Sequence, residues 1–249
     1  ANSGGSHHSS WLGQKFYTRA GMPDDYVEQL QKMWTQRSSE GMSMPTMPSG
    51  YERLENGQVL TIGDHDWQIV VGSGHSPEHA CLYCASLKIM ISGDQILPII
   101  TSNVSVHPTE PNANPLKDWM DSHDRFLSTP EDTFILPAHN LPFYGVRERL
   151  RELISHHDDR MLAIEEACVE PHIAKDLLPV LFARELDPRQ MMMALGEAIA
   201  HVHLLIHHNR IGRELHEDGR YRFRSIDPDL DRRAHPGQHN APIDGPVMV

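Results

Sequence analysis

The sequence predicts an α/β protein in which a layer of short strands precedes a smaller helical unit. Three observations support this fold class. Alternating apolar and polar residues, which are typical of strands, occupy residues 51–92. From residue 145 the apolar residues recur at helical spacing, and residues 213–226 carry the turn signal of a β-hairpin. Strands followed by helices in this order indicate a layered α/β arrangement with the sheet inside.

The N-terminal region predicts one amphipathic helix between two irregular segments. Residues 1–10 are small and polar, which is typical of a loose terminus or of a chain that enters in the middle of a fold. Residues 23–34 predict a helix, because two aspartates stand in its first turn and its apolar residues are spaced helically: Val27, Leu30 and Trp34. Residues 41–50 are rich in Met, Pro and Ser and predict a loop.

The central region predicts the sheet. Turn signals at Asn56-Gly57 and at Asp64 separate runs with a period of two. We expect antiparallel strands at residues 51–54, 59–62 and 67–71, and two further strands at residues 79–85 and 88–92. A helix at residues 116–127 and a short buried strand at residues 133–136 follow.

The C-terminal region predicts three helices and a hairpin. From Gly145 onward the pattern is helical, and one apolar stripe consists of Val146, Leu150, Ile154, Met161 and Ile164. We expect a second helix at residues 172–183, and a third that begins at Asp187-Pro188, with Gln190 three residues after the N-cap. A hairpin around Asp218-Gly219 completes the outline of a winged helix. The expected units are residues 1–160, residues 161–226 and a mobile tail at residues 227–249.

Composition limits the possible partners and compartment. The chain has 22 Lys and Arg against 34 Asp and Glu, so its formal charge of −12 creates no global attraction to nucleic acid or anionic lipid. The arginines between Arg210 and Arg224 leave room for a local basic patch, but we do not expect nucleic acid binding. Three cysteines do not make a disulfide framework, and neither a membrane span nor a signal peptide is apparent in the sequence. We therefore expect a soluble cytoplasmic protein.

Three apolar strands deliver a metal-competent side chain at their ends. His75 lies in the Gly-rich segment after residues 67–71, Asp94 follows the sequence Ile-Ser-Gly, and His139 follows Phe-Ile-Leu-Pro-Ala. Taken singly, each has an ordinary structural explanation, such as a loop histidine or an Asx turn. Taken together, two imidazoles and one carboxylate form the ligand set expected for zinc, or for iron or manganese in a related site.

The motifs GHSPEH, SGD and PAHN resemble three ligand motifs of the metallo-β-lactamase superfamily. The resemblance covers about residues 50–226. Through GDQILPIITSNVSVHP and DLLPVLFARELDP, the sequence is especially similar to bacterial hydrolases of this superfamily that carry a C-terminal winged-helix domain. It implies an αββα sandwich, here N-terminally incomplete, and a site for two zinc ions. By that resemblance His75 binds the first ion, Asp94 bridges the two ions, and His139 binds the second ion. The resemblance also implies that His79 orients the substrate or stabilises the loop.

The superfamily's upstream signature HxHxDH does not occur in the sequence. His7-His8 and Asp64-His65-Asp66 are the nearest candidates, and neither has the spacing. The expectation is that the chain begins after this signature. With only His75, Asp94 and His139 of the ligand set, one weakly held ion is expected instead of two tightly bound ions.

The resemblance implies a metal-dependent hydrolase that cleaves an ester, thioester or lactam-like bond of a small molecule with a metal-activated water. Two alternatives stay open: a two-metal nuclease, and a catalytically inert module that is truncated or binds a partner. A homodimer is also compatible with the family.

Two weaker patterns have structural explanations that we prefer. Cys81 and Cys84 have CxxC spacing, but residues i and i+3 of a strand point to opposite faces. His203 and His207 stand at i and i+4 on the third helix and could chelate a metal, but they flank its apolar stripe and lack an obvious third ligand, so packing is the better interpretation.

Overall fold

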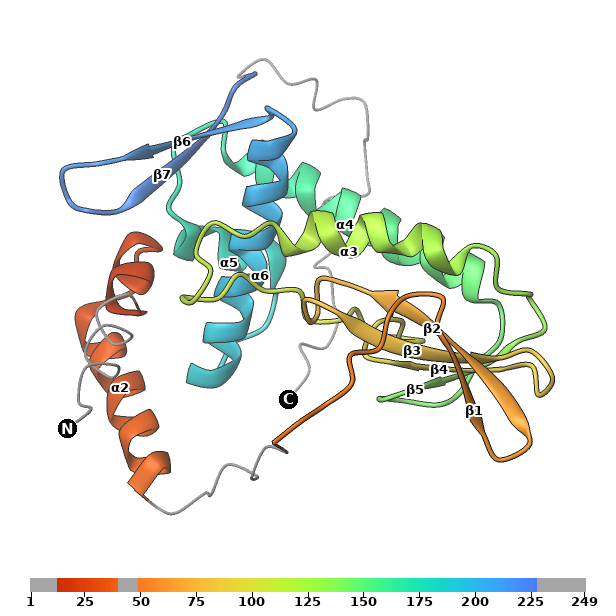
Figure 1. Ribbon diagram of the computed structural model, residues 1–249. Helices are drawn as coiled ribbons and strands as arrows, with labels where there is room; N and C mark the ends of the chain where they lie inside the picture. The colour runs from red at the N-terminus through yellow and green to blue at the C-terminus, as the bar shows by residue number, and fades with distance from the viewer. Residues whose placement is uncertain (1–12, 40–48, 228–249) are drawn as a thin grey trace.

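The computed structural model describes residues 13–39 and 49–227 of the 249-residue chain (Figure 1). A helical segment at residues 13–19 comes first. The elements that follow are α2 (Asp24–Ser39), β1 (Val59–Ile62), β2 (His65–Gly72), β3 (His79–Cys84), β4 (Ile89–Gly93), α3 (Pro115–Ser122), η1 (His123–Phe126), β5 (Phe134–Pro137), α4 (Val146–Ala167), η2 (Ala174–Leu177), α5 (Leu178–Leu181), α6 (Pro188–His207), β6 (Ile211–Leu215) and β7 (Tyr221–Ser225). The expected loose terminus at residues 1–10, most of the loop at 41–50, and the tail beyond residue 227 lie outside the described residues.

Five strands form one sheet in the order β1-β2-β3-β4-β5. Strands β1 to β4 pair antiparallel as a meander, whereas β4 and β5 pair parallel. Because β2 is two antiparallel steps from β4, the strands β2, β4 and β5 all run in the same direction. Their carboxyl ends therefore meet at one edge of the sheet, where β3 begins.

Helices α3 and α4 lie on one side of this sheet (Figure 1). Leu116 and Trp119 of α3 and Leu150 of α4 share a buried core with Met90 and Ile135 of the sheet. Burying these side chains away from water is the main contribution that holds the two layers together. The α/β class predicted from the sequence is confirmed.

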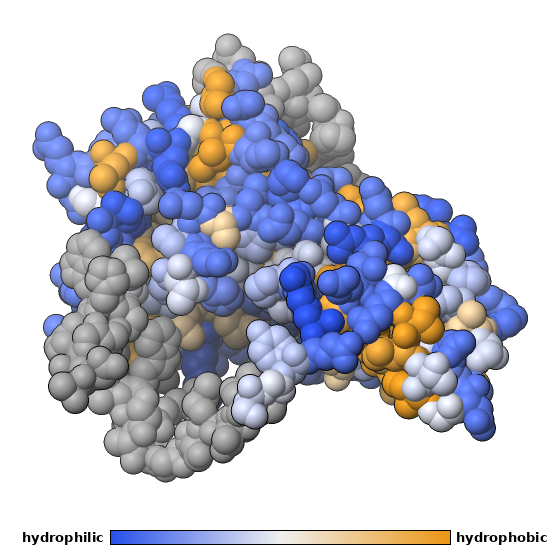
Figure 2. Space-filling model, in the orientation of Figure 1, coloured by the Kyte–Doolittle hydropathy of each residue, from blue (hydrophilic) through white to orange (hydrophobic). Residues whose placement is uncertain are grey.

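Several large apolar side chains of the strands are exposed, among them Val59, Ile62 and Ile91. Figure 2 shows the resulting apolar surface over the sheet. Among the described residues, the only other sheet is the two-stranded β6–β7 hairpin. The described residues therefore do not include a second large sheet that would pack face to face with β1–β5 in a sandwich.

The C-terminal part consists of α4, α5, α6 and the hairpin β6–β7. The predicted start of the third helix is confirmed, because the side chain of Asp187 accepts hydrogen bonds from the backbone N–H groups of Arg189 and Gln190 in a capping box. The predicted hairpin is also present. Helix α4 runs for 22 residues without interruption and passes through residue 160, where we placed the boundary between the two units.

Two predicted elements were wrong. Residues 51–54 do not form a strand: Tyr51 is 85% exposed, and strands need a neighbour to satisfy their backbone groups. Residues 172–183 are not one helix either. The backbone of His172 pairs instead with that of Phe223 in the hairpin, and the segment breaks into η2 and α5 before Phe182 becomes extended. Pro179 lacks the N–H group that a continuous helix would use.

No helix in the described ranges combines the length and the apolar character that crossing a lipid bilayer requires.

Buried histidines fill the space between α3, α4 and α6. The Nδ1 of His201 donates to the carbonyl oxygen of Glu197 at 2.8 Å, so its Nε2 accepts from the Nδ1 of His157 at 3.0 Å. The ring of His123 packs edge-on against Trp119, and its two nitrogens have no hydrogen-bond partner among the described residues. Burial lowers the pKa of His123 from 6.5 to about 4, and burial, followed by the charge of Arg160, lowers that of His201 to about 3. These histidines are neutral in the folded protein at pH 7.

We predict that the protein loses stability as the pH falls from about 7 to 4. The unfolded chain protonates these histidines near pH 6.5, whereas the folded protein keeps them neutral until their lower pKa values are reached. Their contribution is therefore complete above pH 6.5 and is lost below it, by about 1 to 2 kcal/mol per histidine between pH 7 and 5. Urea unfolding at several pH values measures this loss. His123→Leu should flatten the pH dependence, whereas His216→Gln, at an exposed position, should leave it unchanged. An unchanged slope in His123→Leu would contradict the assignment.

Candidate metal centre

The predicted metal ligands stand at one edge of the sheet because of its topology. His75 follows the end of β2, Asp94 follows the end of β4 directly, and His139 follows the end of β5. The parallel pairing continues past the strands, since the backbone N–H of Ala138 donates to the carbonyl of Gly93 at 2.9 Å. The carboxyl ends of parallel strands are the usual place for ligands in open α/β sheets.

The three side chains meet around Asp94. The Nε2 of His75 lies 3.7 Å from Oδ2 of Asp94, and the Nε2 of His139 lies 3.2 Å from Oδ1. The side chains of His75, Asp94 and His139 are 27%, 23% and 46% exposed, so the cluster is open to solvent. Two histidines from distant parts of the chain thus reach the same carboxylate, each at a different oxygen.

A backbone carbonyl orients His75. Its Nδ1 donates to the carbonyl oxygen of Asn103 at 2.9 Å, which leaves Nε2 facing Asp94. A metal-binding histidine commonly donates its second nitrogen to a carbonyl in this way, because the bond fixes both the tautomer and the ring orientation.

The segment that carries Asn103 is held by α6. The Ser105 hydroxyl lies 2.8 Å from Oδ1 of Asn103 and 3.2 Å from the carbonyl oxygen of Met193. The N–H of Val106 donates to the carbonyl of Gly196 at 3.0 Å. The contact is so close that a Cβ on Gly196 would lie 2.8 Å from the Cβ of Ser105. The orientation of His75 therefore depends on the position of a helix in the C-terminal part.

The turn at Asp94 is built on a glycine and on His79. Gly93 has a φ of +53°, and a Cβ there would lie 2.4 Å from Nε2 of His79. The N–H of Asp94 donates to that nitrogen at 3.2 Å, and the Nδ1 of His79 lies 3.3 Å from the Ser76 hydroxyl. Burial lowers the pKa of His79, and the neighbouring His75 lowers it further. Both ring nitrogens of His79 are engaged in holding the loop, and a contact with substrate stays a prediction.

One oxygen of the Asp94 carboxylate lacks a hydrogen-bond partner within the residues that the structure describes. Its Oδ1 is buried without a hydrogen-bond partner in the described part of the chain, which is costly for a carboxylate oxygen. Two ligands of one zinc ion, each bonded at about 2 Å, lie about 3 to 3.5 Å apart. The two nitrogen–oxygen distances around Asp94 are near that range, and they involve different carboxylate oxygens. The donor set therefore fits a bridging carboxylate with one imidazole on each side.

The cluster is incomplete as a metal site. Across residues 13–39 and 49–227, no three His, Cys, Asp or Glu side chains are grouped closely enough to hold an ion by themselves. His75 and His139 form two separate pairs with Asp94. Asp64, His65 and Asp66 lie at the β1–β2 turn, at the opposite end of β2, and His7 and His8 lie outside the described residues.

The other candidate residues have structural roles. Cys81 and Cys84 are buried free thiols, and the Sγ of Cys81 donates to the carbonyl oxygen of Ser92 at 3.4 Å. The Nδ1 of His203 donates to the carbonyl oxygen of Ala113 at 2.7 Å. Asn103 and Ser105 were not anticipated from the sequence, because no local motif marks a carbonyl that orients a distant histidine.

Comparison with known proteins supports the fold. The structure is similar to a β-lactamase domain protein from Burkholderia ambifaria, with 40% sequence identity, a TM-score of 0.75, and coverage of 84% of this chain and 60% of that chain. It also resembles a metallo-β-lactamase family protein from Thermus thermophilus, with 24% identity, a TM-score of 0.61, and coverage of 87% of this chain and 69% of that chain. The chain thus spans about 60% of the length of the Burkholderia protein.

Two family descriptions match the sequence. The C-terminal domain of metallo-beta-lactamase-like proteins matches residues 161–226, which cover the end of α4 through the β6–β7 hairpin. The metallo-beta-lactamase superfamily matches residues 9–139, a stretch that includes all three clustered ligand candidates and makes up more than half of the sequence. With this match and the fold and geometry described above, the chain belongs to the metallo-β-lactamase superfamily.

Proposed function

We propose that the chain contributes His75, Asp94 and His139 to a two-zinc centre that hydrolyses an ester, thioester or lactam-like bond of a small molecule. The observation that carries this proposal is the arrangement around Asp94, whose two carboxylate oxygens each face one imidazole nitrogen. A carboxylate between two imidazoles at the carboxyl ends of parallel strands is suited to bridging two cations.

In this proposal the protein's own residues position and neutralise charge. His75 and His139 present imidazole nitrogens, and Asp94 presents carboxylate oxygens, which together would hold the cations in place. The bound ions would supply the Lewis acidity that activates water and polarises the scissile carbonyl oxygen. His79 keeps the Asp94 turn rigid through the bond to its backbone N–H, so that the carboxylate does not need to reorganise during the reaction.

The proposed substrate and compartment follow from charge and from the cysteines. A net charge of −12 disfavours polyanionic substrates, which argues for a small molecule over RNA. Cys81, Cys84 and Cys168 are buried free thiols, which suits a reducing cytoplasm. Helices α4, α5 and α6 with the β6–β7 hairpin make up the unit that we propose to be a winged helix.

We predict that Asp94→Asn weakens zinc binding at least about tenfold, because it removes the charge that the two imidazoles share. Isothermal titration calorimetry with zinc chloride measures the affinity and the stoichiometry. The matched control is Asp64→Asn, which changes the same charge at an exposed position in the β1–β2 turn and should bind zinc as the unmodified chain does. Equal affinities for the two variants would contradict the site assignment.

Hydrolysis assays separate the remaining alternatives. p-Nitrophenyl acetate, a thioester, a lactam and a short RNA should be tested with zinc and with a chelator. Cleavage of one of the first three, lost with chelator and in Asp94→Asn, supports the proposal, whereas cleavage of RNA alone supports a nuclease. Zinc binding without any hydrolysis supports the inert module.

We also predict that Ser105→Ala weakens zinc binding several-fold, since the serine holds Asn103, whose carbonyl orients His75. Outer-shell partners of this kind typically affect metal affinity about 10-fold or more when they contact the ligand directly, and Ser105 acts one step further out. The comparison variant is Ser86→Ala, which removes a hydroxyl that lies 3.1 Å from Nδ1 of the distant His65. Identical zinc affinities in both serine variants would show that Ser105 does not position His75.

A further inference from the structure

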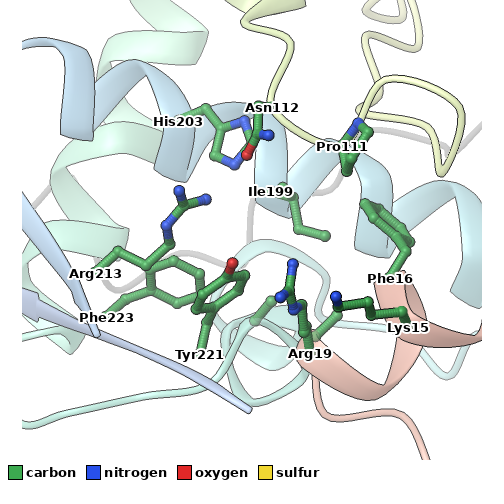
Figure 3. Close-up of a pocket in the computed structure, with 12 residues that line it drawn as sticks. Lys15, Phe16, Arg19, Pro111, Asn112, Ile199, His203, Arg213, Tyr221 and Phe223 are labelled. Carbon is green, nitrogen blue, oxygen red and sulfur yellow. The ribbon is translucent and has the colours of Figure 1, made fainter. Parts of the chain in front are cut away.

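A second cavity lies away from Asp94, between the N-terminal helical segment, the loop at residues 111–112, α6 and the β6–β7 hairpin (Figure 3). Its empty space is about 650 Å³, a volume that includes solvent at its open mouth. Its apolar wall includes Phe16, Ile199 and Phe223, and none of these residues belongs to the candidate metal centre.

The charges that line this cavity all have one sign. Lys15, Arg19 and Arg213 contribute cationic side chains, and no Asp or Glu is among the lining residues. This contrasts with the rest of the chain, which carries an excess of acidic residues. A concave surface with several cations and no carboxylate attracts anions, because the low-dielectric walls strengthen its positive potential.

Two of these cations share one aromatic ring. The guanidinium carbon of Arg19 lies 5.1 Å from the ring centroid of Tyr221, and that of Arg213 lies 4.5 Å from the same centroid. Neither arginine forms an ion pair with a carboxylate within the described residues, whereas Arg210 pairs with Glu165 and Arg222 with Asp218. Figure 3 shows both side chains next to the ring of Tyr221. Stacking on the ring positions the guanidinium groups while their N–H donors remain available.

Neutral polar groups lie at the other end of the cavity. His203 donates through Nδ1 to the carbonyl of Ala113, so its Nε2 is left as an acceptor, and Asn112 lines the same cavity. Burial lowers the pKa of His203, and the charge of Arg213 lowers it further, so the ring is neutral at pH 7. The cavity thus offers cations and an aromatic ring on one side and hydrogen-bonding groups on the other.

We propose that this cavity binds a small organic anion, with its phosphate or carboxylate held by Arg19 and Arg213 and its flat apolar body packed against Phe16 and Phe223. Guanidinium groups bind both kinds of oxyanion with paired hydrogen bonds, and the aromatic residues add contact area that an inorganic ion cannot use. None of the residues that line this cavity belongs to the proposed metal centre.

Calorimetric titration with phenyl phosphate, benzoate, inorganic phosphate and phenol tests the proposal. Metal-free protein in chelator is used, so that phosphate cannot bind through zinc. Phenyl phosphate or benzoate should bind in a 1:1 ratio and at least about tenfold more tightly than inorganic phosphate or phenol. Asp94→Asn should bind the preferred probe with unchanged affinity, which separates this site from the metal centre.

Charge-removing variants locate the binding. Arg19→Gln and Arg213→Gln should each weaken the preferred probe about tenfold, because each removes a charged pair of hydrogen bonds. The matched control is Arg224→Gln on the same hairpin, which is exposed and does not line the cavity. Its affinity should match that of the unmodified chain, and thermal melting confirms that each variant is folded. Should Arg19→Gln fail to fold, Arg213→Gln, at an exposed hairpin position, decides the outcome.

Several results would overturn the proposal. Binding that does not saturate, or that survives both Arg19→Gln and Arg213→Gln, means that the cavity is not the site. A short RNA that competes with the probe, and that loses affinity equally in Arg213→Gln and Arg224→Gln, would identify the hairpin as a nucleic acid surface instead.

Discussion

The segment from Asp94 to Val106 is the constraint on which the candidate metal centre depends. The segment begins at Asp94, and the Ser102 hydroxyl donates a hydrogen bond to the backbone carbonyl of Asp94. It then supplies the Asn103 carbonyl to His75 and ends bonded to Gly196 in α6. Arg149 of α4 donates to the carbonyls of Leu97 and Ile100 in the same segment. Helices α4 and α6 thus hold in place the loop that positions the ligand candidates.

The juxtaposition of His75, Asp94 and His139 could be predicted from the sequence because its signal is local. Each ligand candidate lies within three residues of the end of a strand, and the residues around it include glycine, proline or asparagine. Asn140, which follows His139, has a φ of +66°, a conformation that asparagine tolerates better than most residues. Strand ends and their turns can be recognised in a single sequence, and parallel pairing then brings them together.

Features that depend on distant partners could not be predicted in this way. The segment 51–54 has strand composition but no neighbour to pair with, and His172 leaves its expected helix for a backbone partner in the hairpin. The same limit applies to Arg19 and Arg213, since nothing in the sequence around either residue indicates that both lie against the ring of Tyr221. The contact of His157 with His201 likewise joins residues that share no motif.

Helix α4 has a consequence for how the two parts of the molecule can move. It packs through Leu150 in the core shared with the sheet, and near its C-terminal end it binds the hairpin, where the N–H of Ser225 donates to the carbonyl of Cys168 directly after the helix. A hinge needs a flexible joint, and a continuous 22-residue helix provides none at this boundary. Relative motion is therefore restricted to small sliding of packed helices. The two parts would respond to a bound ligand as one mechanical body, and a protease would find no linker between them within α4.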